Sequence, residues 1–330
     1  MKKTHPQQSR PPADRMGAVV LSRYSVGDSD YIVTFLTREQ GLVSALAKNA
    51  RQSIRRFGGN LLSPGMAAWY YLRQRPNSNL AFVERGEINP AAPNLPMDPI
   101  CRALVAWALE LVRAFEAHHN PAEPTFNLLL RHFGALAAAS DFAAPSLAAR
   151  RLSFGFTKCY LQIAGFGVGA ENCCICGKKD SESWYAEPSF DGLICRQCER
   201  FLDRRLHNIP NSLREALLTT ATHRSSPQLD EETLNIAENY FQHRASVQAG
   251  RAFKSPKVLR QLLENNPSDA SNARRESMNS PMNSPMNAPM NTPISASINA
   301  PINASINASS VQQNTPNSND DRIRPGSEGV

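Results

Sequence analysis

The sequence of 330 residues lacks any long hydrophobic run. No stretch approaches the roughly 20 apolar residues that a membrane-spanning helix needs. The basic N-terminal segment around Lys2, Lys3 and Arg10 is not followed by the apolar segment of a secretory signal. We therefore expect a cytoplasmic protein with no membrane partner.

Several motifs of catalytic and nucleotide-binding proteins are also missing. No phosphate-cradling GxxxxGK[ST] sequence occurs, which disfavours an ATPase. The glycines at Gly165, Gly167 and Gly169 lack the spacing of a dinucleotide fingerprint, so we interpret them as a helix cap and loop. No His-x-Glu accompanies the cysteine pairs, as a zinc deaminase would require. These absences argue against an enzyme.

What the sequence does have is a basic excess, a formal charge of +7, and most of it lies in one segment. Between Ser44 and Arg85, seven basic residues oppose the single acidic residue Glu84, a local charge of +6. The basic residues are Lys48, Arg51, Arg55, Arg56, Arg73, Arg75 and Arg85. Such a segment suits a polyanionic partner.

Composition and patterning divide the chain into zones and predict an α+β multidomain protein. Residues 1–15 are polar and proline-rich and predict a flexible basic arm. Residues 16–90 predict five short strands and hence a small barrel, for which an OB-fold is the candidate and an SH3-like barrel the alternative. The strands are expected at Gly17–Tyr24, Asp30–Thr37, Gly41–Lys48, Gly65–Arg75 and Asn79–Glu87, and the insert Arg51–Leu62 is expected to cap the barrel.

Residues 96–265 change to a helical period and predict an α-helical domain, with an insert at residues 173–198. After the insert, helical patterning resumes at 202–220, 230–244 and 257–263. In residues 266–330, methionine or isoleucine recurs every four residues, but the interspersed prolines forbid a helix. We expect this tail to be disordered.

Four of the cysteines in the insert form two CxxC pairs, Cys173 with Cys176 and Cys195 with Cys198, separated by 18 residues. This spacing is typical of a structural zinc site with four thiolate ligands at about 2.3 Å and no open position for catalysis. Cys174 is a spare thiol, because only Cys173 leaves a two-residue gap to Cys176. The alternative is that these cysteines are redox-active or merely buried.

The predicted fourth strand alternates aromatic and basic residues. One face would hold Ala68, Tyr70 and Leu72, and the other Trp69, Tyr71, Arg73 and Arg75. Interleaved rings and cations suit single-stranded nucleic acid, because bases stack while the cations neutralise phosphates. The alternative is a solvated strand face with Trp69 packed under the insert. The candidate DNA-binding residues are Lys48, Arg51, Arg55, Arg56, Trp69, Tyr71, Arg73 and Arg75.

Four motifs follow one another along the chain: Gly41–Arg51 with the basic residues downstream, the strand end at Glu84–Ile88, the CxxC pairs, and Lys254–Leu259. In the order of these motifs, the chain resembles the RecO family of bacterial recombination mediators. The resemblance covers residues 16–265 and excludes both ends of the chain.

The resemblance implies an N-terminal OB-fold, a helical domain and an inserted zinc site. It also implies a non-enzymatic role in the RecF pathway: binding single- and double-stranded DNA, annealing complementary strands and helping RecA to load. RecR and the acidic C-terminal tail of single-strand-binding protein would be partners, RecA an indirect one, and the nucleoid the place of action. The rival hypothesis is a zinc-ribbon module that docks proteins and contacts DNA incidentally.

Overall fold

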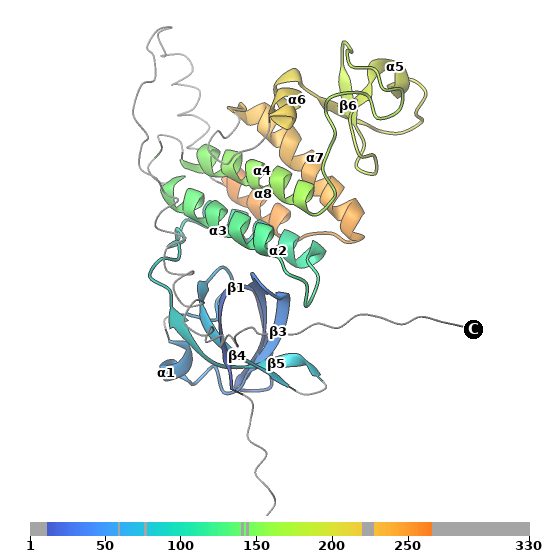
Figure 1. Cartoon of the computed structure of the whole chain (residues 1–330). Helices are drawn as coiled ribbons and strands as arrows, with labels where there is room; N and C mark the ends of the chain where they lie inside the picture. The colour runs from blue at the N-terminus through green and yellow to red at the C-terminus, as the bar shows by residue number, and fades with distance from the viewer. Residues whose placement is uncertain are drawn as a thin grey trace, which may run out of the picture. The chain divides into compact units, whose positions relative to one another are not determined.

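The computed structural model describes residues 12–58, 60–75, 78–139, 142, 145–219 and 228–265. Within these ranges a barrel of strands precedes a group of helices, as the colour gradient of Figure 1 shows. The predicted tail and residues 1–11 of the predicted arm lie outside the described residues. No described helix combines the length and the apolar character needed to cross a membrane.

The barrel is built from β1 (Asp14–Val26), β2 (Asp30–Thr37), β3 (Gly41–Ala47), β4 (Ala67–Arg75) and β5 (Ser78–Ile88). The strand order is β1-β2-β3-β5-β4, and β4 closes on β1. All neighbouring strands are antiparallel except β3 and β5, which run parallel. This parallel pairing is the OB-fold closure, and an all-antiparallel SH3-like barrel lacks it. The predicted OB-fold is confirmed.

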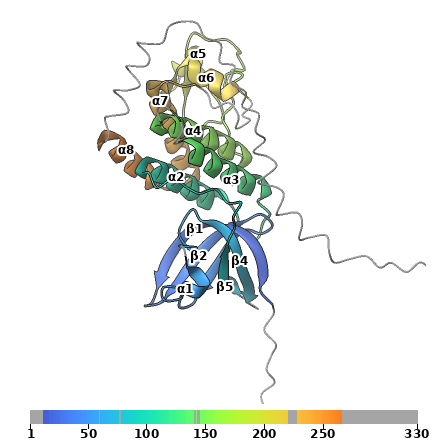
Figure 2. The same ribbon diagram turned by 90° about the vertical axis from the view of Figure 1, so that its left-hand side faces the viewer.

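The interior of the barrel follows from the alternation of its strands. Val33 and Phe35 of β2 are buried, as are Tyr70 and Leu72 of β4. The insert between β3 and β4 contains the short helix α1 (Ile54–Phe57), which lies at the lower end of the barrel in both views (Figures 1 and 2). Three insert residues join the barrel core, so the insert caps the barrel as expected; they are Phe57, Leu61 and Leu62.

The helices are α2 (Pro99–Phe115), α3 (Glu123–Ala138), α4 (Pro145–Ile163), α6 (Asn211–Leu218), α7 (Glu231–Ala249) and α8 (Ser255–Asn265). Helix starts use aspartate caps: Asp98 accepts a hydrogen bond from the Cys101 amide at 2.7 Å, and Asp230 accepts one from the Thr233 amide at 2.7 Å. The positive φ of Gly250, +62°, ends α7.

A small sheet interrupts the helices between α4 and α6. It consists of β6 (Trp184–Ala186), β7 (Ile194–Cys195) and β8 (His207–Ile209) in the order β7-β6-β8, with the short helix α5 (Arg196–Glu199) after β7. We call residues 169–209 the cysteine module. The helix expected from residue 202 begins only at Asn211, because residues 207–209 pair with β6, and this nonlocal partner overrides the helical pattern.

Barrel and helices share one apolar core, in which Val19 and Leu42 of the barrel pack with residues of α2 and α4. The Leu42 amide donates to the Ala117 carbonyl at 3.1 Å. Gly41 precedes this contact with a φ of +58°, and a Cβ there would lie 2.2 Å from the Asn120 carbonyl oxygen. The close approach of the loop between α2 and α3 to β3 therefore requires glycine at this position.

We predict that Gly41→Ala lowers the free energy of unfolding by about 2–5 kcal/mol. This sums about 1–2 kcal/mol for a side chain in the left-handed region and about 1–3 kcal/mol for overpacking. Gly27→Ala is the matched control, because Gly27 has a φ of +57° but nothing within 4 Å of an added Cβ. Denaturant unfolding of both variants measures the difference, and equal losses would contradict the close approach.

Candidate metal centre and nucleic-acid surface

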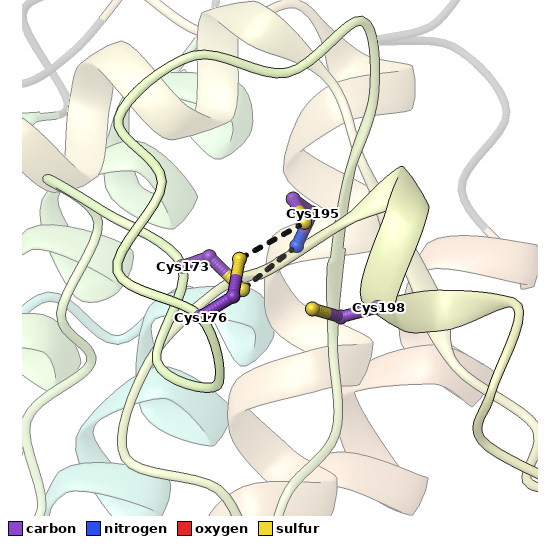
Figure 3. A group of neighbouring side chains, drawn as sticks. All are labelled: Cys173, Cys176, Cys195 and Cys198. Carbon is purple, nitrogen blue, oxygen red and sulfur yellow. Dashed lines mark hydrogen bonds between the residues drawn. The ribbon is translucent and has the colours of Figure 1, made fainter.

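The two CxxC pairs meet in the cysteine module, where the four sulfurs face a common centre (Figure 3). All four Sγ atoms lie within 4.8 Å of one another, and those of Cys176 and Cys195 are 3.7 Å apart. Tetrahedral coordination with bonds of about 2.3 Å places sulfurs about 3.8 Å apart. The donor set therefore fits a tetrahedral metal ion.

Local backbone structure holds each pair. The Gly177 amide donates to the Cys173 carbonyl at 2.9 Å, and Gly177 itself has a φ of +73° that closes this turn. Cys195 ends β7, and Cys198 lies one turn later in α5. The Cys195 amide donates to the Cys173 sulfur at 3.4 Å, so one pair directly orients the other.

The pKa values of two of these thiols are also shifted by their surroundings. Burial raises the pKa of Cys173, but hydrogen bonds from the amides of Cys176, Cys195 and Ile175 outweigh this effect and lower the pKa to about 6. The pKa of Cys198 is raised by desolvation and by hydrogen bonds among the crowded sulfurs. A divalent ion among the sulfurs would favour the thiolate form of its ligands.

The remaining cysteines stay outside this group. The sulfur of Cys174 points to the Gly192 carbonyl at 3.5 Å. Cys101 is buried on α2, and Cys159 is half-buried on α4. The structure thus brings together the four cysteines predicted as ligands and leaves the spare thiol apart.

Two arginines attach the cysteine module to the helices, and the sequence pattern did not single out either. Arg244 of α7 is 0 % exposed. It donates to the carboxylate of Asp191 and to the carbonyls of Phe166, Gly167, Pro188 and Phe190. Arg214 of α6 lies over the Trp184 ring at 4.3 Å and donates to the Ala170 carbonyl at 3.1 Å. Backbone carbonyl oxygens of the module thereby receive hydrogen bonds from side chains of the helices.

On the barrel, three of the predicted DNA-binding residues gather around Phe82, a half-buried ring on β5. Their cationic groups lie 4.9 to 5.7 Å from its centroid; the residues are Lys48, Arg73 and Arg75. Arg73 also pairs with Glu84 at 2.9 Å. Alternation along β5 could have identified Phe82, because Ala81 and Val83 on either side of it are buried.

The second ring of the barrel's basic region is Tyr31 on β2. Arg51 lies over it at 5.7 Å and Arg23, which the sequence pattern missed, at 4.5 Å. Arg51 also donates to the Asp28 carbonyl at 3.1 Å. We call the two groups, Phe82 with Lys48, Arg73 and Arg75 and Tyr31 with Arg23 and Arg51, the barrel's basic surface.

Two further predicted DNA-binding residues, Arg55 and Arg56, lie on α1 outside these two groups. Arg56 of α1 donates to the Ser53 hydroxyl at 2.9 Å and to the Lys48 carbonyl, so it supports the insert. Arg55 is exposed and forms no ion pair with any described residue. Its charge is therefore available to a ligand.

Trp69 and Tyr71 lie on the predicted outer face of β4 but are already engaged by protein groups. Trp69 packs against Gly17 and under Arg15, whose guanidinium is 4.4 Å from the ring. Arg85 covers Tyr71 at 3.6 Å, and the Tyr71 hydroxyl donates to Glu87 at 3.2 Å. Glu87 also pairs with both of these arginines. This end of β4 is less positive than the Phe82 group.

Comparison with known proteins agrees with both halves of the structure. A family model described as Recombination protein O N terminal matches residues 14–90, and one described as Recombination protein O C terminal matches residues 98–246. A protein named DNA repair protein RecO from Anaeromyxobacter dehalogenans (strain 2CP-C) is 34 % identical over 58 % of this chain and 73 % of its own length. One of the same name from Syntrophotalea carbinolica is 26 % identical over 75 % of this chain and 94 % of its own length.

We predict that the purified chain contains about one zinc ion, bound by the four thiolates. Cys195→Ser should lose the metal and destabilise the module, because the site then loses one of its two buried ligands. Cys174→Ser is the matched control and should retain both metal and stability. Elemental analysis and thermal unfolding measure these outcomes, and a Cys195→Ser protein with full zinc content would refute the ligand set.

Proposed function

The chain belongs to the Recombination protein O (RecO) family, and from this premise we propose that it is a non-catalytic mediator of DNA repair and recombination. In this role it binds single- and double-stranded DNA, anneals complementary strands and assists the loading of RecA. Its partners are RecR and the acidic C-terminal tail of single-strand-binding protein, and it works on the bacterial nucleoid.

The observation that carries the proposal is the group of three cations around the half-exposed ring of Phe82. OB-folds bind oligonucleotides on the face of their second and third strands and on adjacent loops. Phe82 lies opposite Leu46 of β3, so this ring borders that face. A ring that can stack a base, beside cations that can neutralise phosphates, supports binding of a single strand without sequence preference.

Annealing fits such a surface because it requires no bond-making residue. Two complementary strands repel each other, and cations that screen their phosphates lower this repulsion. The barrel's basic surface supports DNA handling over the rival hypothesis of a protein-docking zinc ribbon, for which a neutral barrel would suffice.

For the cysteine module we propose a structural zinc ion. With four thiolate ligands a zinc ion has no open position for water or substrate, so it supplies folding energy, about 10–16 kcal/mol in zinc-finger peptides. The chain's own residues then act as ligands through Cys173, Cys176, Cys195 and Cys198, while Arg244 and Arg214 attach the module to the helices.

We predict that neutralising Arg51, Arg55 and Arg56 with glutamine weakens single-strand binding. If about six cations contact phosphates, the log-log salt slope is about −4, and removing three contacts flattens it to about −2. Fluorescence anisotropy over a salt series measures this slope. The matched control, the helix variant, carries glutamine at Arg102, Lys257 and Arg260 of the helices. If the barrel variant, with glutamine at Arg51, Arg55 and Arg56, kept its affinity at low salt, these three barrel arginines would not belong to the site.

We further predict that the full chain accelerates annealing of complementary strands and that the barrel variant does so more slowly, because fewer phosphates are neutralised. Quenching of paired fluorophores on the two strands follows the reaction. The helix variant should anneal at the unaltered rate. Absence of acceleration at every protein concentration would contradict the mediator role.

A further inference from the structure

A cleft of about 330 Å³ lies between β1, α2 and the connection from α7 to α8. The barrel contributes Arg23 and Tyr24, α2 contributes Arg113, and the connection contributes Arg251 and Lys254. Lys254 opens the segment Lys254–Leu259, whose role the proposed function leaves unexplained.

The cleft carries four cations and one carboxylate. The carboxylate of Glu110 already has protein partners. Its Oε2 accepts hydrogen bonds from the amides of Lys254 and Ser255 at 3.0 and 3.1 Å and thereby caps α8. Within the described residues none of the four cations forms an ion pair. The cleft therefore carries a net positive charge, from Arg23, Arg113, Arg251 and Lys254 against the single carboxylate of Glu110.

The large apolar side chains of the cleft are almost closed to a ligand, whereas the smaller Pro64 and Ala252 are exposed. Leu21 and Leu109 are each 4 % exposed and Phe253 is 7 % exposed, with its ring edge-on to Trp107 at 5.2 Å. Tyr24, in contrast, is 53 % exposed and accepts a hydrogen bond from Arg113. A ligand would therefore meet the cations, the ring of Tyr24 and two small apolar residues, a combination that suits the phosphates, sugar and base of a nucleotide.

The cleft is also continuous with the barrel's basic surface. Arg23 lines the cleft and lies over the Tyr31 ring at 4.5 Å, and the same ring lies beneath Arg51 of the basic surface. Arg23 therefore belongs both to the cleft and to the barrel's basic surface.

We propose that this cleft binds the sugar–phosphate backbone of a nucleic-acid strand extending from the barrel, with Tyr24 stacking on a base. This inference rests on the proposed function, because it takes the strand to be held first on the barrel. The cleft would add a second contact between the protein and the strand, made by the helices. Only a strand longer than the barrel's own site would reach it.

Strand length tests the proposal. An OB-fold occupies about 4–16 nucleotides, so labelled oligothymidylates of about 8 and about 20 nucleotides separate barrel binding from binding that includes the cleft. With Arg251→Gln and Lys254→Gln together, the salt slope for the longer strand should flatten by about 1.4, while binding of the shorter strand is unchanged. Tyr24→Ala should weaken the longer strand alone by about 5- to 150-fold, the equivalent of one lost stacking contact.

Lys257→Gln is the matched control, because Lys257 is exposed on α8 close in sequence to Lys254 but does not line the cleft. Unchanged binding of the longer strand by the cleft variants, or equal weakening of both strands, would overturn the proposal. If the cleft variants lost binding to a labelled octaglutamate peptide but still bound the longer strand normally, the cleft would be assigned to an acidic peptide instead. If the unaltered protein fails to bind the shorter strand, the barrel proposal fails, and the longer strand still tests the cleft by itself.

Discussion

The buried guanidinium group of Arg244, together with the guanidinium group of Arg214, fixes the cysteine module on the helices. A fully buried charge is costly unless hydrogen bonds surround it, and here the end of α4, the loop before β7 and the carboxylate of Asp191 all supply acceptors. Those acceptors are mostly backbone carbonyls that need a donor of their own. Protein contacts therefore attach the module, and the metal ligands only have to hold its two cysteine pairs together.

This arrangement separates two tasks within one chain. The four sulfurs lie within the cysteine module, whereas the rings and cations suited to nucleic acid lie on the barrel strands and the insert. The two groups share no residue and no secondary-structure element. A metal ion with four thiolate ligands leaves no coordination position for a substrate, and the barrel's basic surface needs no metal.

The sequence predicted features that depend on local spacing. The cysteine pairs, the five strands and the outward orientation of Trp69 and Tyr71 all follow from short-range patterns. Features that depend on distant partners were missed: alternation along β5 places Phe82 on the outer face, but strand pairing is what brings cations from separate segments around Phe82 and Tyr31. Arg244 was missed because a helical arginine is normally solvated. The helix start expected at residue 202 was wrong because β8 pairs with β6, and the helix begins at Asn211.

The central claim is that DNA is handled by the barrel and that the cysteine module is architectural. Hydrogen–deuterium exchange of the full chain, with and without a single-stranded oligonucleotide, tests this claim most directly. The account predicts added protection in β3, β5 and the insert around α1, with exchange at residues 173–198 unchanged. Protection centred on the cysteine module, with the barrel unaffected, would contradict it.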